Sequence, residues 1–101
     1  MLWNPDLTVE IALLPTSEGG RAGAIVGEWY GCPIGATNAY FDVRFDLTSI
    51  HRVEPGTTAV LPAKFLDPTL ALPQFQVGRE FSIWEGRVIG TGRVLEVCGD
   101  T

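Results

Sequence analysis

The chemistry open to this chain depends first on His51, its single histidine. A histidine acts as a general base when an acid orients it and a nucleophile lies within reach. Asp46, Ser49 and Glu54 are close to it in the sequence. This spacing falls at the end of an expected strand and in its turn, where polar residues gather anyway. We therefore favour a surface-loop histidine over a hydrolase, and we predict that the protein is not an enzyme.

Cys32 and Cys98 are the other side chains with reactive potential. No neighbour in the sequence would lower the pKa of Cys32, which favours a buried, inert thiol over a nucleophile. Two cysteines and one histidine cannot fill a tetrahedral zinc site, so we predict no metal and no cofactor. One disulfide is arithmetically possible. The chain starts without a secretory signal pattern, however, and we expect a reduced, cytoplasmic protein.

Length and composition bound the remaining possibilities. The chain has 101 residues, of which 46% are hydrophobic, and we expect one domain over 1–101 with 1–6 as an N-terminal tail. Twelve acidic residues against seven basic ones give a net charge of −5. Nucleic-acid affinity depends on cations that neutralise phosphates, so a nucleic-acid partner is not expected, and a cationic partner is mildly favoured. No apolar stretch reaches the roughly 18 residues that a membrane span needs.

Short segments of alternating polarity, separated by Gly and Pro, predict an all-β fold. The clearest is 40–47, where Phe41, Val43, Phe45 and Leu47 alternate with polar residues, as in an antiparallel sheet with one wet face. The strands that we expect are 7–14, 22–30 (a weaker one), 40–47, 57–66, 80–84 and 88–97. Segments 31–38 and 67–78 are expected loops. Six short strands at this spacing favour a barrel or a sandwich.

Three details refine this expectation. Pro62 cannot donate to a ladder, so the strand 57–66 should have an edge position or a bulge there. Gly90 and Gly92 interrupt a strong strand, which indicates a bulge or a close approach of another backbone at a barrel corner. In the loop 67–78, the apolar residues should lie over a barrel end; these are Leu70, Leu72 and Phe75.

Large aromatic residues beside glycines are the candidates for binding a partner. Trp29 and Tyr30 lie between Gly27 and Gly31, and Trp84 immediately precedes a hairpin turn. Aromatic side chains in such loops are typical of binding anchors. The alternative is that they pack over a barrel end. A second alternating set, Asp42, Arg44 and Asp46, could form a recognition stripe, although the solvated side of a strand is the favoured interpretation.

Several motifs in order resemble the C-terminal (third) domain of elongation factor Tu. They are Glu18-Gly19-Gly20-Arg21 after a first strand, Val53-Glu54-Pro55-Gly56, Pro68, and the stretch from Phe81-Ser82-Ile83-Trp84-Glu85-Gly86 to Gly90-Thr91-Gly92-Arg93-Val94. The resemblance covers 7–97 and implies a six-stranded antiparallel closed β-barrel. It does not imply GTP hydrolysis. The chain departs from the family at Trp84, where an arginine is usual, and in the segments near the family's tRNA contacts.

Together these observations predict a stand-alone, translation-factor-like barrel that binds a protein partner without catalysis. An inhibitor or immunity-type role fits, as does a subunit role. A homodimer formed through the strand around Pro62 or through the Trp29–Tyr30 loop is a variant. We expect the partner-binding residues to be Trp29, Tyr30, Trp84 and Arg21, and we expect no small-molecule substrate. The alternative function is a tRNA- or ribosome-associated accessory protein, which the resemblance implies.

Overall fold

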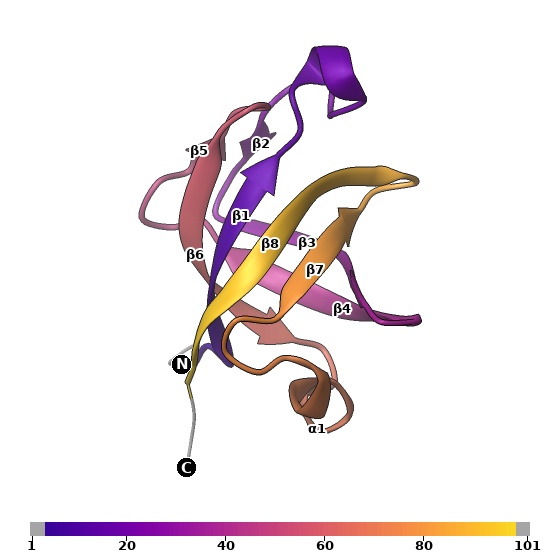
Figure 1. Ribbon diagram of the computed structural model, residues 1–101. Coiled ribbons are helices and arrows are strands. Elements are labelled where there is room, and N and C mark those ends of the chain that lie inside the picture. Colours follow the sequence, from indigo (N-terminus) through magenta and orange to yellow (C-terminus); the bar gives the residue numbers. More distant parts are fainter. Residues whose placement is uncertain (1–3, 99–101) are drawn as a thin grey trace.

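The computed structural model describes residues 4–98 and confirms the predicted closed barrel of six antiparallel strands (Figure 1). The barrel strands are β1 (Leu7–Leu13), β3 (Trp29–Ala36), β4 (Ala39–Asp46), β6 (Thr58–Phe65), β7 (Glu80–Trp84) and β8 (Val88–Val97). Two short strands, β2 (Ile25–Val26) and β5 (Arg52–Val53), form a separate two-stranded sheet. The helical turns are η1 (Thr16–Glu18), α1 (Pro68–Ala71) and η2 (Leu72–Gln74).

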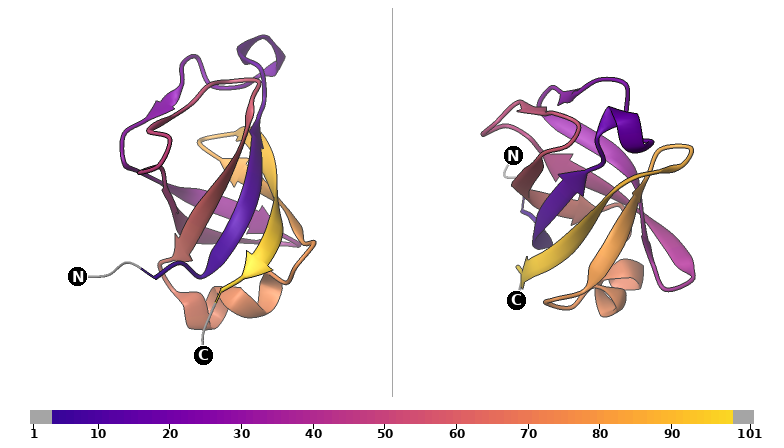
Figure 2. Two further views of the ribbon diagram at one scale, coloured as in Figure 1. Left: turned by 90° about the vertical axis from the view of Figure 1, so that its left-hand side faces the viewer. Right: turned by 45° about the horizontal axis from the view of Figure 1, so that its top comes forward.

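The strands follow the order β1-β6-β4-β3-β7-β8, after which β8 pairs with β1 and closes the barrel. Within this order, β3, β4 and β6 are successive neighbours, and β7 returns to lie beside β3. This is the Greek-key arrangement, in which a fourth strand comes back to the first. Figure 2 shows that β2 and β5 lie beyond one end of the barrel and α1 lies at the other. Of the predicted tail 1–6, residues 1–3 lie outside the described residues, and Asp6 donates its N–H to the carbonyl of Ala63 at 2.8 Å.

The alternation seen in the sequence produces the core. In β1 every second residue is buried, and the same holds for the predicted inward set of β4, of which only Phe41 is partly exposed. Side chains of a strand point alternately to its two faces, so one face of each strand fills the barrel. The solvated interpretation of the other β4 face also fits, because Asp42 and Arg44 are exposed and Asp46 is half-buried.

The largest difference from expectation concerns the segment 22–38. The predicted strand 22–30 is broken at Gly27 and Glu28, and the predicted loop 31–38 is mostly strand β3. Cys32, Ile34 and Ala36 point inward, whereas the residues that suggested a loop occupy the outward positions between them; these are Gly31, Pro33 and Gly35. Because Gly31, Pro33 and Gly35 face outward, their small or rigid side chains do not weaken the packing of the core. The buried residues between them give β3 the alternating pattern of a strand.

The two prolines that lie within strands, Pro33 and Pro62, each come just before the residue at which pairing with one of the two neighbouring strands begins. Pro33 precedes Ile34, the first β3 residue that pairs with β7, and Pro62 precedes Ala63, the first β6 residue that pairs with β4. A proline has no N–H for a ladder, so these positions suit it. Strand β6 is not an edge strand, since it pairs with β1 and β4, but its pairing with β4 does not reach Pro62.

Of the two alternatives predicted for the glycines of β8, a bulge or a close backbone approach, the structure shows the close approach. A Cβ atom on Gly90 would lie 2.5 Å from the carbonyl oxygen of Ala12 in β1. A Cβ atom on Gly92 would overlap the ring of Phe81 and lie 3.0 Å from the carbonyl oxygen of Glu10. Only glycine lets β1, β7 and β8 approach so closely.

The segment after β6 lies at one end of the barrel (Figure 1), and Phe75 from this segment packs into that end, as predicted. Phe75 is fully buried, and its ring centroid lies 4.9 Å from that of Phe65, 5.6 Å from that of Phe41 and 6.0 Å from that of Phe81. The expectation for Leu70 was wrong, because its side chain is 64% exposed. The turn of α1 instead points Ala71 inward, and the Asp67 carboxylate caps this turn by accepting from the N–H of Leu70 at 3.3 Å.

Candidate surface for a protein partner

The seam between β3 and β7 positions most of the predicted binding residues. These two strands share only two residue pairs, Ile34 with Ile83 and Gly35 with Ser82. The neighbouring β3–β4 ladder has eight pairs. Side chains join β3 to the β7 region on both sides of this short ladder. On one side Tyr30 contacts Glu85, and on the other Arg79 donates to the Thr37 hydroxyl.

Tyr30 and Arg21, two of the predicted residues, meet on Glu85. The Tyr30 hydroxyl donates to Glu85 Oε2 at 2.5 Å, and Arg21 Nε donates to Glu85 Oε1 at 2.9 Å. The Arg21 guanidinium also lies 5.7 Å from the centre of the Tyr30 ring, within cation–π range. These contacts tie β3, the segment before β2 and the β7–β8 turn together at one barrel end. We name Arg21, Tyr30 and Glu85 the seam cluster.

The protonation states of the seam cluster follow from its surroundings. Burial and the hydrogen bond to Glu85 raise the pKa of Tyr30 far above its usual value, so Tyr30 stays a neutral donor. Partial burial of Glu85 works to raise the pKa of this carboxyl. The hydrogen bonds from Tyr30 and Arg21 and the charges of Arg21 and Arg87 outweigh that effect, and the pKa of Glu85 lies below 4.5. Glu85 is therefore an ionised acceptor at neutral pH.

Tyr30 is consequently a packing residue with one polar contact. Its ring stacks on the core residue Phe45, with 6.4 Å between centroids and 11° between planes. The side chain is only partly exposed, in accord with the alternative that this residue packs over a barrel end. Trp29, its neighbour, points to the outside of β3, is 40% exposed and lies opposite Asp46 of β4.

Trp84 has a different setting on the outer face of the barrel. Its ring centroid lies 5.5 Å from that of Tyr40, with the planes tilted by 54°. Tyr40 is 56% exposed and Trp84 is 36% exposed. The two side chains come from β4 and β7, on either side of β3, and we name them the aromatic pair.

Gly35 of β3 makes the aromatic pair possible. It lies between Tyr40 and Ser82 in the sheet, and a Cβ atom there would be 2.8 Å from Tyr40 Cε1 and 2.7 Å from Ser82 Oγ. The absent side chain leaves room for the Tyr40 ring to lie across β3. Tyr40 was not singled out from the sequence, because its meeting with Trp84 depends on two registers that cross Gly35.

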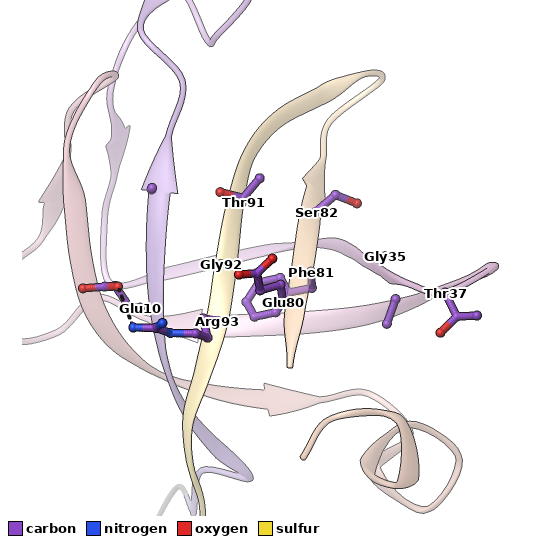
Figure 3. A pocket seen from close by; sticks show the side chains of 11 residues that line it. Glu10, Gly35, Thr37, Glu80, Phe81, Ser82, Thr91, Gly92 and Arg93 are labelled. Carbon is purple, nitrogen blue, oxygen red and sulfur yellow. Dashed lines mark ion pairs between the residues drawn. The ribbon is translucent and has the colours of Figure 1, made fainter. Parts of the chain in front are cut away.

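A groove of about 580 Å³ adjoins the aromatic pair on the outside of β1, β8 and β7 (Figure 3). Small side chains form its middle, since Ala12, Thr91, Ser82 and Gly35 are successive cross-strand neighbours. Two residues further along each strand, on the same face, stand Glu10 in β1, Arg93 in β8 and Glu80 in β7. Figure 3 shows Arg93 pointing toward Glu10, and the two charged groups lie 3.9 Å apart. We name this feature the β8 groove.

The residues first considered for catalysis lie apart from these features. His51 is exposed in the loop between β4 and β5, with φ 62°, and its side chain makes no hydrogen bond or ion pair with residues 4–98. Cys32 is buried on the inner face of β3, and burial raises its pKa to about 12. Cys98 is partly exposed beside Thr8, and both cysteines are free thiols.

Two further observations concern the described part of the chain. Within residues 4–98, no group of three or more His, Cys, Asp or Glu side chains is arranged to hold a metal ion. No helix among these residues is long and apolar enough to cross a membrane.

Comparison with known proteins assigns no family to the barrel. The chain matches no protein-family model, and no curated protein matches it by sequence.

Proposed function

We propose that this protein is a non-enzymatic interaction module, a barrel like the third domain of elongation factor Tu, that binds a partner protein through the aromatic pair. The observation that supports this most is the contact of Tyr40 and Trp84 on the outer face, where both remain accessible. Large aromatic side chains supply much of the binding energy at protein interfaces because they bury a large area with few rotatable bonds. The motif order from Glu18 to Val94 supports the likeness to the translation factor.

The surroundings of the aromatic pair fit an interface. Val88 lies opposite Trp84 in the β7–β8 pairing and is 41% exposed, so the apolar surface continues beyond the two rings. The β8 groove, with its small side chains, provides a recess beside them for protruding groups of a partner. The two free thiols favour a cytoplasmic setting, where cysteines stay reduced.

A tRNA- or ribosome-associated role has less support from the surface charges. Six of the seven basic side chains contact the protein's own acids, carbonyls or hydroxyls within residues 4–98; they are Arg21, Arg52, Lys64, Arg79, Arg87 and Arg93. A phosphate backbone would have to compete with these contacts while the net charge of −5 repels it.

The test compares affinity capture by the natural protein with capture by a Tyr40→Ala, Trp84→Ala double variant. Tagged protein is incubated with native lysate, and the captured proteins are quantified by mass spectrometry. We expect at least one protein that the natural barrel enriches and the double variant loses. Leu70→Ala is the matched control, since Leu70 is 64% exposed at the other end of the barrel. Circular dichroism checks that each variant is folded.

Two results would refute the proposal. One is a set of captured proteins that does not change in the double variant. The other is the absence of any enriched protein together with a monomeric mass in light scattering, since self-association through the aromatic pair would appear as a dimer that the double variant abolishes. Enrichment of tRNA or ribosomal RNA that is lost at about 200 mM salt would instead favour the translation-linked role.

A further inference from the structure

A second groove lies over β3, β4 and β6, on the other side of the aromatic pair. It has a volume of about 600 Å³, and its outward-facing lining residues are Gly31, Pro33, Asp42, Arg44, Lys64 and Leu66. We name it the β4 groove. It is continuous with the aromatic pair through β4, because Tyr40, Asp42 and Arg44 alternate along the same outer face of that strand.

Two cations stand side by side in this groove. Arg44 and Lys64 are direct cross-strand partners in the β4–β6 ladder. In an antiparallel pair such residues have Cβ atoms roughly 4.5–5.5 Å apart, and like charges at these positions destabilise the sheet. The chain has twelve acidic residues and only seven basic ones, so composition gives no reason for two cations to meet here.

The protein neutralises this pair only in part. Lys64 Nζ lies 4.0 Å from Asp6 Oδ1 and donates to the Asn4 carbonyl at 3.2 Å. The other oxygen of Asp6 accepts from the N–H of Phe65, so this carboxylate is shared. The Arg44 side chain is exposed and makes no ion pair or hydrogen bond with residues 4–98. An unpaired guanidinium beside an ammonium group is suited to receive a carboxylate.

The walls of the β4 groove favour a ligand that carries an apolar group beside its negative charge. Leu66 is 79% exposed, the largest exposure among the bulky hydrophobic residues that the structure describes, and Pro33 lines the opposite wall. The Asp42 carboxylate lies in the same groove, so two cations stand there against one acid; this suits a single carboxylate better than a phosphate backbone, whose binding draws on many cations. A ligand with one carboxylate next to an apolar side chain therefore matches both the charged groups and the apolar walls of the β4 groove.

We infer that the β4 groove binds an acidic segment of a partner protein, with a Glu or Asp carboxylate between Arg44 and Lys64 and a neighbouring aliphatic side chain against Leu66. This rests on the proposed function, since it extends the contact surface of the aromatic pair along β4. The net charge of −5 favours a cationic partner for the molecule as a whole. The groove selects the opposite charge for the segment that it contacts.

The test is an NMR titration of the ¹⁵N-labelled protein with an acetylated, amidated peptide of sequence Ala-Leu-Glu-Glu-Leu-Ala. The matched peptide carries Gln in place of both Glu residues. We expect the Glu peptide to shift the amide signals of Arg44, Lys64 and Leu66. We also expect it to bind about two- to fivefold more tightly than the Gln peptide at low salt, which is the range for an exposed ion pair.

Variants assign the effect to Arg44. Arg44→Gln should weaken the Glu peptide about two- to fivefold and leave the melting temperature unchanged or slightly raised, because a like-charge pair is removed. Arg93→Gln is the matched control, since Arg93 is an exposed arginine in the β8 groove. It should leave peptide affinity unchanged.

Other outcomes would overturn the inference. They are equal binding of the Glu and Gln peptides, shifts confined to the β8 groove, or no shifts at millimolar peptide. Inorganic phosphate that competes as tightly as the Glu peptide would also overturn it, in favour of a simple anion site. None of these results changes the outcome of the capture experiment on Tyr40 and Trp84, so each proposal can be refuted without the other.

Discussion

At the scale of single residues, the hydrogen bond from Tyr30 to Glu85 connects two segments whose backbones pair only briefly. We predict that Tyr30→Phe lowers the free energy of unfolding by about 1 kcal/mol, because it removes one hydrogen bond to a partly exposed carboxylate. Urea denaturation measures this change. Tyr40→Phe is the control, since the Tyr40 hydroxyl makes no hydrogen bond within residues 4–98. Equal losses in both variants would contradict the assignment.

The same contact predicts a dependence of stability on pH. The folded protein holds the pKa of Glu85 below its ordinary value of 4.5. In the unfolded chain, Glu85 therefore binds a proton at a higher pH than in the folded protein. The stabilisation that ionised Glu85 provides is complete above the ordinary pKa of this carboxyl. It is lost as the pH falls through the lowered pKa. We expect Glu85→Gln to flatten the acid limb of a melting-temperature profile below about pH 4.5, and a limb of unchanged slope would contradict this prediction.

Cys32 and Cys98 should differ in reactivity. Burial raises the pKa of Cys32 to about 12, so almost none of it is thiolate at about pH 8, and its position on the inner face of β3 excludes reagents. We predict that iodoacetamide labels Cys98 in the native protein and labels both cysteines in urea. Mass spectrometry of digested samples distinguishes the sites. Native labelling of Cys32 at the rate of Cys98 would show that β3 opens readily.

At the scale of elements, β8 depends on its glycines. We predict that Gly90→Ala lowers the free energy of unfolding by about 1–3 kcal/mol or more, because the new methyl group meets the Ala12 backbone at 2.5 Å. Gly23→Ala provides the control, since a Cβ atom there has no neighbour within 4 Å. Chemical denaturation of the two variants measures the difference. If Gly90→Ala were as stable as Gly23→Ala, β1 and β8 would not approach as described.

The segment between β6 and β7 stabilises the barrel through one side chain. Phe75 is fully buried against three other phenylalanine rings, and Phe75→Ala should cost about 3–5 kcal/mol. Leu70→Ala, in the α1 turn of the same segment, should cost close to nothing because Leu70 is mostly exposed. Thermal unfolding of both variants tests this contrast. A similar loss at Leu70 would mean that α1 packs through a different face.

The elements that the sequence predicted well are those in which an alternation of polarity can be recognised. The segments 40–47 and 57–66 contain such patterns, and both became barrel strands within one or two residues. Strand β3 was missed because Gly31, Pro33 and Gly35 hide the alternation of Cys32 and Ile34. The turn of α1 was missed because four residues are too few for a helical period.

Only part of the candidate site was predicted, because its contacts join residues that lie far apart along the chain. Trp84 was visible as a large aromatic residue beside a turn, and the structure places it on the outer face. The contact of Arg21 and Tyr30 with Glu85 spans 64 and 55 residues along the chain, so local spacing could not reveal it. The Arg44–Lys64 pair likewise follows from the β4–β6 register, which alternation alone does not determine.

At the scale of the whole molecule, the distribution of charge decides between classes of partner. The net charge is −5, and Arg44 is the one Lys or Arg side chain without a hydrogen bond or ion pair inside residues 4–98. We predict that fluorescence anisotropy detects no binding of labelled tRNA at about 50 mM salt, because too few cations are available to release counterions. Binding that weakens steeply between about 50 and 200 mM salt would contradict this prediction.

The two-pair ladder between β3 and β7 has one more consequence. A closed barrel has no exposed strand edge, and its backbone donors and acceptors are hidden from other chains. Here the closure depends on Ile34, Gly35 and the side-chain contacts that flank them. If this seam parted, the barrel would become a curled sheet whose two margins, β3 and β7, carry unpaired peptide groups. Such a sheet could exchange strands with another copy, and we expect loss of the seam cluster to make the protein more prone to aggregation.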